Sequence, residues 1–245
     1  MIATPPSTVV VLASASPARL SVLRAAGIEP TVIVSGVDED AVQAAHSGAD
    51  PADVVAELAY AKAYAVVAAA GSRFADAVVI GCDSMLWCAG RLTGKPADAA
   101  AARAQWATMA GGRSELLTGH AVVRLANGAV TQTARGTERT EIHFGTPDPA
   151  ELDAYLATGE PLAVAGSLTI DGYGGWFVDG VTGDPSSVIG ISLPLIRRLL
   201  REVGLIVTDL WRRPADSDPV VQRGSIDRQG SIDRQGSIGQ QGEHS

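Results

Sequence analysis

The dipeptide Asn127-Gly128 is the feature that most restricts how this 245-residue chain can fold. It separates two apolar runs, residues 116–125 and 130–144, and Asn-Gly between such runs favours the tight turn of a β-hairpin. Other short apolar runs alternate with helical patterns until about residue 210. Because 46% of the residues are hydrophobic, the chain can bury a core, and the alternation predicts an α/β or α+β fold.

The other elements are expected from apolar spacing and from residues that begin or end helices. Strands are expected over 9–12, 31–34 and 77–82, a further hairpin over 84–92 with its turn at Ala89-Gly90, and helices over 51–70, 97–110, 149–158 and 194–203. The last residues differ, because the repeated hexapeptide Gly-Ser-Ile-Asp-Arg-Gln offers almost no side chain that can pack. We therefore expect a folded domain over 1–213 and a disordered tail with hexapeptide repeats over 214–245.

The segment from Leu12 to Arg19 joins the first expected strand to the first helix through small polar residues. Ser16 can cap that helix, Pro17 suits its first turn, and Gly27 ends it. Backbone N–H groups at such a helix start, with Arg19 beside them, attract anions. An ordinary strand-to-helix connection with a solvent-exposed arginine is the alternative, and this segment alone does not separate the two.

Two carboxylates and two lysines are further candidates for chemistry. Asp83 follows the buried run 78–82, where a strand would deliver its last side chain to a cleft, and a carboxylate there can hold a divalent cation or act as a base on water. Lys95, held between a glycine and a proline, resembles a positioned phosphate contact. Lys62 shares the apolar face of the 51–70 helix, and Glu39 belongs to an acidic loop of the kind that can seat Mg²⁺ against phosphates.

Each candidate also has a structural alternative. Asp83 can cap a turn, Lys62 can extend from the apolar face to solvent, and acidic loops such as the one with Glu39 are most often simply solvated. Taken together, however, the basic residues, the carboxylates and the helix start indicate phosphoryl chemistry with a metal ion.

Charge and motif content argue against several classes of protein. A formal net charge of −8 opposes broad nucleic-acid binding, and the P-loop and dinucleotide-binding glycine patterns are missing. Four histidines without a Gly-x-Ser-x-Gly motif fit a serine hydrolase poorly. Cys82 and Cys88 match no zinc motif and suit a reducing compartment. With no signal peptide and no apolar stretch judged long enough for a membrane span, we expect a cytoplasmic protein that binds neither membrane nor nucleic acid.

An ordered set of short motifs resembles the Maf family of nucleoside triphosphate pyrophosphatases. The motifs are Leu12-Ala-Ser-Ala-Ser-Pro-Ala-Arg19, Val37-Asp-Glu39, Leu58-Ala-Tyr-Ala-Lys-Ala63, Gly81-Cys-Asp-Ser84, Gly94-Lys-Pro96, Gly112-Arg113 with Thr118-Gly119, Gly159-Glu-Pro161 and Gly183-Asp-Pro185. The resemblance covers residues 9–203. It implies a mixed central sheet flanked by helices, with two lobes around a nucleotide-binding cleft, similar to the inosine triphosphate pyrophosphatases. It also implies homodimers that hydrolyse a nucleoside triphosphate between the α and β phosphates.

The resemblance assigns roles to residues. Asp83 is expected to be the general base and, with Glu39, to hold Mg²⁺ or Mn²⁺. The residues expected to bind the substrate phosphates are Ser14, Ser16, Arg19, Lys62 and Lys95.

Three residues depart from the family pattern in regions that help to select the base, namely Ala18, Ser84 and Asp171. Asp171 stands where many members have an amide, and an ionised carboxylate accepts hydrogen bonds but donates none. We therefore expect a substrate preference unlike that of the dTTP- and UTP-cleaving members, such as a modified or noncanonical nucleotide. The alternative function is a nucleotide-binding regulator of cell division or septum formation with little or no turnover. The presence of Asp83 favours turnover, since binding alone needs no base.

Overall fold

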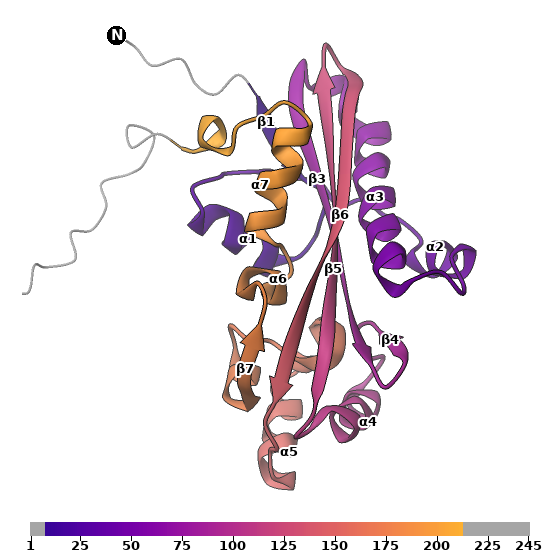
Figure 1. Cartoon of the computed structure of the whole chain (residues 1–245), viewed down its shortest axis with the longest axis vertical. Coiled ribbons are helices and arrows are strands. Elements are labelled where there is room, and N and C mark those ends of the chain that lie inside the picture. The colour runs from indigo at the N-terminus through magenta and orange to yellow at the C-terminus, as the bar shows by residue number, and fades with distance from the viewer. Residues whose placement is uncertain (1–7, 213–245) are drawn as a thin grey trace, which may run out of the picture. The chain divides into compact units, whose positions relative to one another are not determined.

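Strands β5 (Arg113–Ala126) and β6 (Ala129–Phe144) form a long antiparallel hairpin through the fold (Figure 1). Its turn is Asn127-Gly128, with both residues at positive φ, 52° and 74°, which confirms the prediction. The structure is a computed structural model that describes residues 8–212, so the tail expected over 214–245 lies outside the described residues.

The hairpin belongs to a seven-stranded mixed sheet with the order β2-β1-β3-β5-β6-β7, in which β4 pairs with β3. Strand β1 (Val9–Leu12) lies parallel to β2 (Thr31–Val32) and to β3 (Asp76–Cys88). The pairs β3 with β4 (Arg91–Thr93), β3 with β5, and β6 with β7 (Val178–Thr182) are antiparallel. Parallel and antiparallel pairs in one helix-flanked sheet confirm the expected mixed α/β fold.

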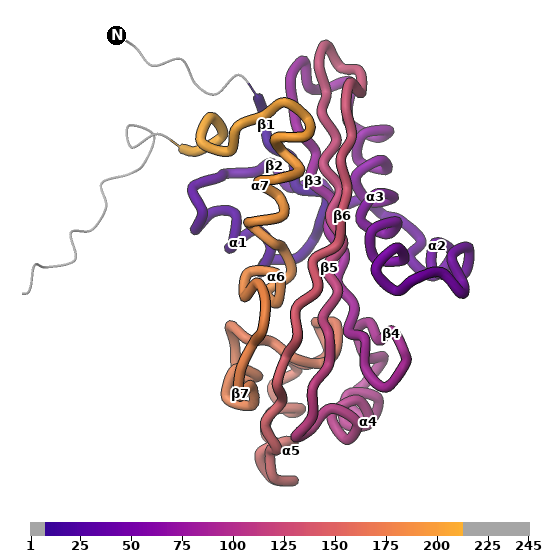
Figure 2. Tube along the Cα trace, in the orientation of Figure 1, coloured from indigo at the N-terminus to yellow at the C-terminus, as the bar shows by residue number. Residues whose placement is uncertain are grey.

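Seven α-helices surround the sheet in the described part of the chain: α1 (Pro17–Ala25), α2 (Glu39–Ala45), α3 (Pro51–Ala70), α4 (Ala99–Met109), α5 (Pro149–Ala157), α6 (Pro185–Ile189) and α7 (Leu193–Glu202). Each begins after a serine or aspartate whose side chain accepts a hydrogen bond from a backbone N–H of the first turn. Helix α3 covers one face of the sheet, and α1 and α7 cover the other (Figures 1 and 2).

Helix α3 lies unusually close to the sheet, because two glycines face it. A Cβ built on Gly119 of β5 would lie 2.0 Å from the carbonyl oxygen of Val55, and one on Gly81 of β3 would lie 2.2 Å from that of Ala59. The helix backbone therefore rests on these glycines, which bring the polar side chains of α3 and β3 within contact distance.

Helix α3 also bears on the expectation about membranes. Together with a following turn of 3₁₀ helix (Gly71–Arg73) it forms a helical segment of 23 residues with a mean hydropathy of 1.4. By length and composition alone, such a segment could span a membrane. The judgement that no stretch reaches that length was therefore wrong. Half of its most apolar window is buried inside the fold, as in the core helix of a folded domain.

Three local expectations need correction. Strand β3 does not end before Asp83 but continues to Cys88, because β5 offers hydrogen-bonding partners along its whole length, with Gly119 opposite Asp83. Glu39 does not lie in a loop, because Asp38 caps α2 and makes Glu39 its first residue. Strand β7 and helix α6, each of five residues, were not expected at all.

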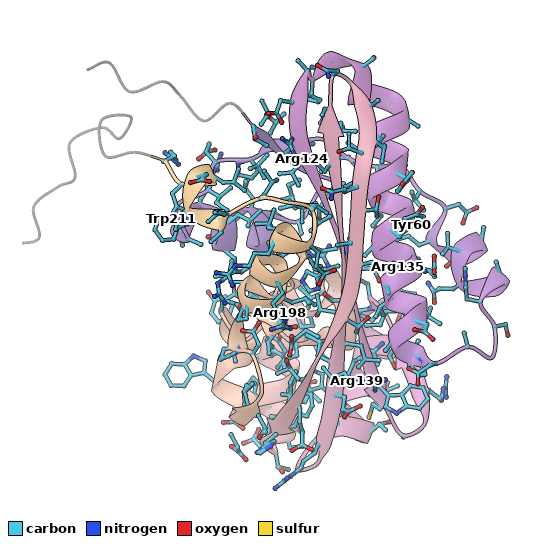
Figure 3. All side chains as sticks on the ribbon, turned by 45° about the horizontal axis from the view of Figure 1, so that its top comes forward. Tyr60, Arg124, Arg135, Arg139, Arg198 and Trp211 are labelled. Atoms are coloured by element: carbon cyan, nitrogen blue, oxygen red, sulfur yellow. The ribbon has the colours of Figure 1, made fainter. Side chains whose placement is uncertain are left out.

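An ion pair at the edge of the sheet supplies a test of stability against pH. Arg124 of β5 (labelled in Figure 3) donates to Asp76 of β3 and to the carbonyl oxygens of Ala77 and Leu125. The hydrogen bond from Arg124, opposed by partial burial, holds the pKa of Asp76 below its ordinary 3.8. The ionised carboxylate therefore stabilises the fold above that ordinary value, and this contribution is lost as the pH falls through the lowered pKa.

Replacing Asp76 with asparagine should thus cost about 1–2 kcal/mol of unfolding free energy at neutral pH. The difference from the wild type should shrink on acidification below about pH 4, which urea titrations at several pH values would measure. A difference that stays constant down to pH 2 would show that charge at Asp76 is not what stabilises this edge.

Candidate functional site

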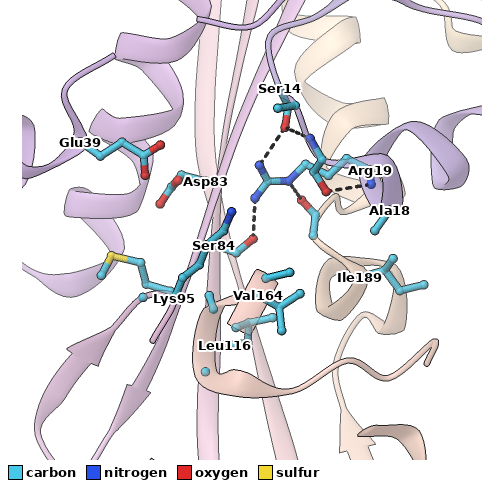
Figure 4. Close-up of a pocket in the computed structure, with 18 of the residues that line it drawn as sticks. Ser14, Ala18, Arg19, Glu39, Asp83, Ser84, Lys95, Leu116, Val164 and Ile189 are labelled. Carbon is cyan, nitrogen blue, oxygen red and sulfur yellow. Dashed lines mark hydrogen bonds between the residues drawn. The ribbon is translucent and has the colours of Figure 1, made fainter. Parts of the chain in front are cut away.

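A cleft of about 850 Å³ opens beside the middle of strand β3 (Figure 4). Its lining includes every residue that the sequence proposed for the site: Ser14, Ser16, Ala18, Arg19, Glu39, Lys62, Asp83, Ser84, Lys95 and Asp171. These residues are spread over more than half of the chain, on α1, α2, α3, β3 and the loops around them. The fold therefore gathers all of the expected site residues around one space.

The chemical centre of the cleft is Lys62, which contacts two carboxylates. Its ammonium Nζ lies 2.5 Å from Oδ1 of Asp83 and 2.7 Å from Oε1 of Glu39. Lys62 and Asp83 are both buried, with 8% and 6% of their surfaces exposed, whereas Glu39 is exposed. The close approach of α3 to the glycines of β3 and β5 holds Lys62 in this position instead of letting it extend to solvent.

The pKa of Asp83 is raised from its ordinary value. Burial raises it most, the positive charges of Lys62 and Arg19 oppose that effect, and the negative charge of Glu39 adds to it. A carboxylate with a raised pKa binds a proton more readily than an exposed one. Asp83 therefore has the protonation chemistry that a general base acting on water requires.

Arg19 is fixed by four hydrogen bonds to other parts of the protein. Its Nε donates to the carbonyl oxygen of Gly190 at 2.8 Å, and Nη1 donates to that of Cys82 at 2.9 Å and to Ser14 Oγ at 3.2 Å. Its Nη2 donates to Ser84 Oγ at 3.1 Å (Figure 4). A guanidinium has five N–H donors, so Arg19 presents its charge and one remaining N–H to a ligand.

In the turn between β1 and α1, some backbone N–H groups donate to serine side chains of the same turn. Ser14 Oγ accepts the backbone N–H of Ser16, and Ser16 Oγ accepts that of Arg19. Among the described residues, the N–H groups of Ser14, Ala15 and Ala18 have no partner. The expected phosphate cradle thus has three free backbone donors in the turn before α1 and in its first turn.

The other end of the cleft is mostly apolar. Its lining there comprises Leu86, Leu116, Ile142, Leu168 and Val188. Exposed Lys95 points into the cleft (Figure 4), and exposed Asp171 lines it, with no ion pair recorded for either in the described chain. Charged groups at one end and apolar side chains at the other suit a ligand with an anionic part and a flat apolar part.

The sequence analysis assigned no role in the site to two buried residues of β5, Thr118 and His120. Thr118 donates to the carbonyl oxygen of Ser187 at 3.1 Å and lies 3.2 Å from Ser84 Oγ, so it connects Arg19, through Ser84, to helix α6. Its position opposite Ser84 could have been found by pairing the Thr118-Gly119 motif with Asp83-Ser84 across the sheet. His120 accepts the backbone N–H of Ser192, and burial lowers its pKa to about 3, so it stays neutral and supports α7.

The residues present fit a divalent cation that binds together with phosphates. No group of three or more His, Cys, Asp or Glu side chains suited to a metal occurs within residues 8–212. Glu39 and Asp83 nevertheless face one point, since both contact the same ammonium. Mg²⁺ is commonly held by one or two carboxylates, with substrate phosphates and water as its other ligands.

Comparison with known proteins agrees with this site. The family described as Maf-like protein matches residues 9–203. A nucleoside triphosphate pyrophosphatase of Nocardia farcinica (strain IFM 10152) is 61% identical over 210 residues, which are 85% of this chain and 99% of that protein. A protein of the same name from Rhodococcus jostii (strain RHA1) is 61% identical over 204 residues, which are 82% of this chain and 95% of that protein. Another, from Saccharopolyspora erythraea, is 58% identical over 205 residues, which are 83% of this chain and 97% of that protein. The chain belongs to the Maf family.

Proposed function

We propose that the chain is a nucleoside triphosphate pyrophosphatase and that this cleft is where it hydrolyses its substrate to a monophosphate and pyrophosphate. Two observations support the activity. The chain belongs to this family, and relatives named nucleoside triphosphate pyrophosphatase are about 60% identical to it over more than 200 residues. The observation that carries the location is the buried Asp83–Lys62 pair inside a cleft with one charged and one apolar end.

In the proposed reaction Asp83 takes a proton from a water molecule. The water oxygen forms a bond to the α phosphorus, and the bond from the α phosphorus to the oxygen that bridges it to the β phosphate breaks. Pyrophosphate leaves with the electron pair. Arg19, Lys62 and Lys95 would hold the phosphates and offset the negative charge that develops on the leaving group.

Glu39 and Asp83 would hold Mg²⁺ or Mn²⁺. When bound, the cation supplies positive charge that polarises the phosphate oxygens and reduces repulsion of the nucleophile. Lys62 supplies one positive charge between the two carboxylates, which leaves one negative charge for the cation to offset, and a remaining N–H of Lys62 would reach a phosphate oxygen.

The nucleoside would occupy the apolar end of the cleft, and Asp171, which lines the cleft, would be the acidic group that it meets. Ser84 is turned toward Arg19 and Thr118, so its effect on selectivity would be indirect. Ala18 lies at the start of α1, beside the proposed phosphate donors. We also propose a preference for modified or noncanonical nucleotides over dTTP and UTP, because an ionised carboxylate has no donor for the two ring carbonyl oxygens of thymine and uracil.

The test is release of pyrophosphate by the purified chain from a panel of canonical and modified nucleoside triphosphates. We expect release with Mg²⁺ or Mn²⁺ and none after chelation with EDTA, with activity restored by adding the cation back. Activity that persists in EDTA would remove the metal from the proposal. Tight nucleotide binding without release from any substrate would instead favour the regulatory function.

The homodimer and the cytoplasmic location remain predictions. Sedimentation of the purified chain would measure the first, and cell fractionation the second.

A further inference from the structure

The carboxylate of Glu160, which does not line the cleft, is at the centre of a tightly wound loop. Glu160 begins a short 3₁₀ helix (Glu160–Ala163) just after α5. Its Oε1 accepts hydrogen bonds from the hydroxyl of Thr169 and from the backbone N–H of Gly174 at 3.0 Å, and its Oε2 accepts the N–H of Tyr173 at 3.1 Å. One side chain thus joins three donors that lie nine to fourteen residues further along the chain.

The loop leaves no spare room around this carboxylate. A Cβ on Gly172 would lie 2.4 Å from Oε2 of Glu160, so only glycine fits at that position without moving the loop or the carboxylate. Partial burial raises the pKa of Glu160, but the Thr169 hydroxyl and the amides of Tyr173 and Gly174 together outweigh it, and the pKa lies below its ordinary value. All three donors are thus satisfied by an ionised group.

The loop held by Glu160 forms one wall of the cleft. Its residues that line the cleft include Val164, Gly166, Leu168, Thr169 and Asp171. Further hydrogen bonds attach the wall to the rest of the fold, and two of them are to Trp106 and Gly94. Trp106 Nε1 donates to the carbonyl oxygen of Ser167 at 3.0 Å, and the N–H of Gly166 donates to the carbonyl oxygen of Gly94, next to Lys95, at 3.2 Å.

We infer that Glu160 is a positioning residue, whose carboxylate fixes the 164–171 wall against which the nucleoside part of the substrate binds. The inference rests on the proposed function of the cleft. Glu160 touches none of the groups that would act on the phosphates, which lie on α1, α2, α3 and β3 and, for Lys95, in the loop after β4. Its loss should therefore weaken binding of the nucleoside without slowing the chemical step.

The test replaces Glu160 with glutamine, which keeps the shape but puts an NH₂ group where an acceptor is needed. We expect KM for the best substrate to rise about tenfold and kcat to stay within about twofold. Inhibition by inorganic pyrophosphate, which probes only the charged end, should keep its wild-type constant. Glu202→Gln, at an exposed position at the end of α7, is the matched control and should leave all three values unchanged.

Thr169→Val removes one of the three donors to Glu160 and keeps the side-chain volume. We expect a smaller rise in KM than for Glu160→Gln. If Glu160→Gln does not fold, the KM of Thr169→Val tests the inference in its place. An unchanged KM, or equal losses in KM, kcat and pyrophosphate inhibition, would overturn the inference. The proposed function would survive that outcome, because it depends on Asp83 and is tested separately below.

Discussion

Replacing Asp83 with asparagine should lower kcat for pyrophosphate release by at least about a thousandfold, because the amide keeps the shape of the side chain but cannot take a proton from water. The amide also carries no charge for a divalent cation, so loss of the base and weaker metal binding act in the same direction. Nucleotide binding, measured by calorimetry, should persist because Arg19 and Lys95 are unchanged. Wild-type turnover in this variant would exclude Asp83 from the mechanism.

The same variant should not be less stable than the wild type. Because burial raises the pKa of Asp83, the ionised carboxylate costs folding free energy at pH values above the raised pKa, and the cost shrinks as the pH falls from there and is absent below the ordinary pKa. Asparagine removes that cost, and Glu39 still neutralises Lys62. We expect a melting temperature at or above that of the wild type at neutral pH. Asp53→Asn, on the exposed side of α3, is the matched control and should keep full activity.

The largest loss of stability is expected from Gly119→Ala. The added methyl group would lie 2.0 Å from the carbonyl oxygen of Val55 and would push α3 off the sheet. Overpacking against backbone should cost about 3 kcal/mol or more, which corresponds to a fall of roughly 10 °C in the melting temperature. Activity should fall as well, since Lys62 moves with α3 away from Asp83.

Gly136→Ala is the control for that change. Gly136 lies in β6 of the same sheet, and its added Cβ would meet flexible leucine side chains at ordinary distances, 3.4 Å for Leu195 and 4.0 Å for Leu199. We expect a change of less than about 1 kcal/mol, measured by urea unfolding. If both alanine variants were equally stable, the close contact between α3 and β5 would not be what holds the helix in place.

Local sequence determined the elements whose signals lie within a few residues. Ser16 and Pro17 set the start of α1, and Asn127-Gly128 set the turn of the long hairpin. Such signals are legible because a cap or a turn is decided by the backbone preferences of adjacent residues. The ordered motifs also identified the residues that share the cleft, although not how they interact.

Tertiary structure decided the rest. Strand β3 continues through Asp83 because β5 supplies hydrogen-bonding partners for it. Asp83 pairs with Gly119, which is 36 residues further along the chain. The five-residue β7 and α6 have local preferences too weak to predict, and each exists because it packs against β6.

The same division holds for the site. The sequence by itself determined which charged residues this protein has and which helix or strand carries Lys62 and Asp83. It left open whether Lys62 extends to solvent or pairs inside the fold. The glycines under α3 decided that, because they let the helix approach until an ammonium and a carboxylate 21 residues apart in sequence lie 2.5 Å from each other. Contacts of this kind depend on distances between elements, which no local pattern of residues specifies.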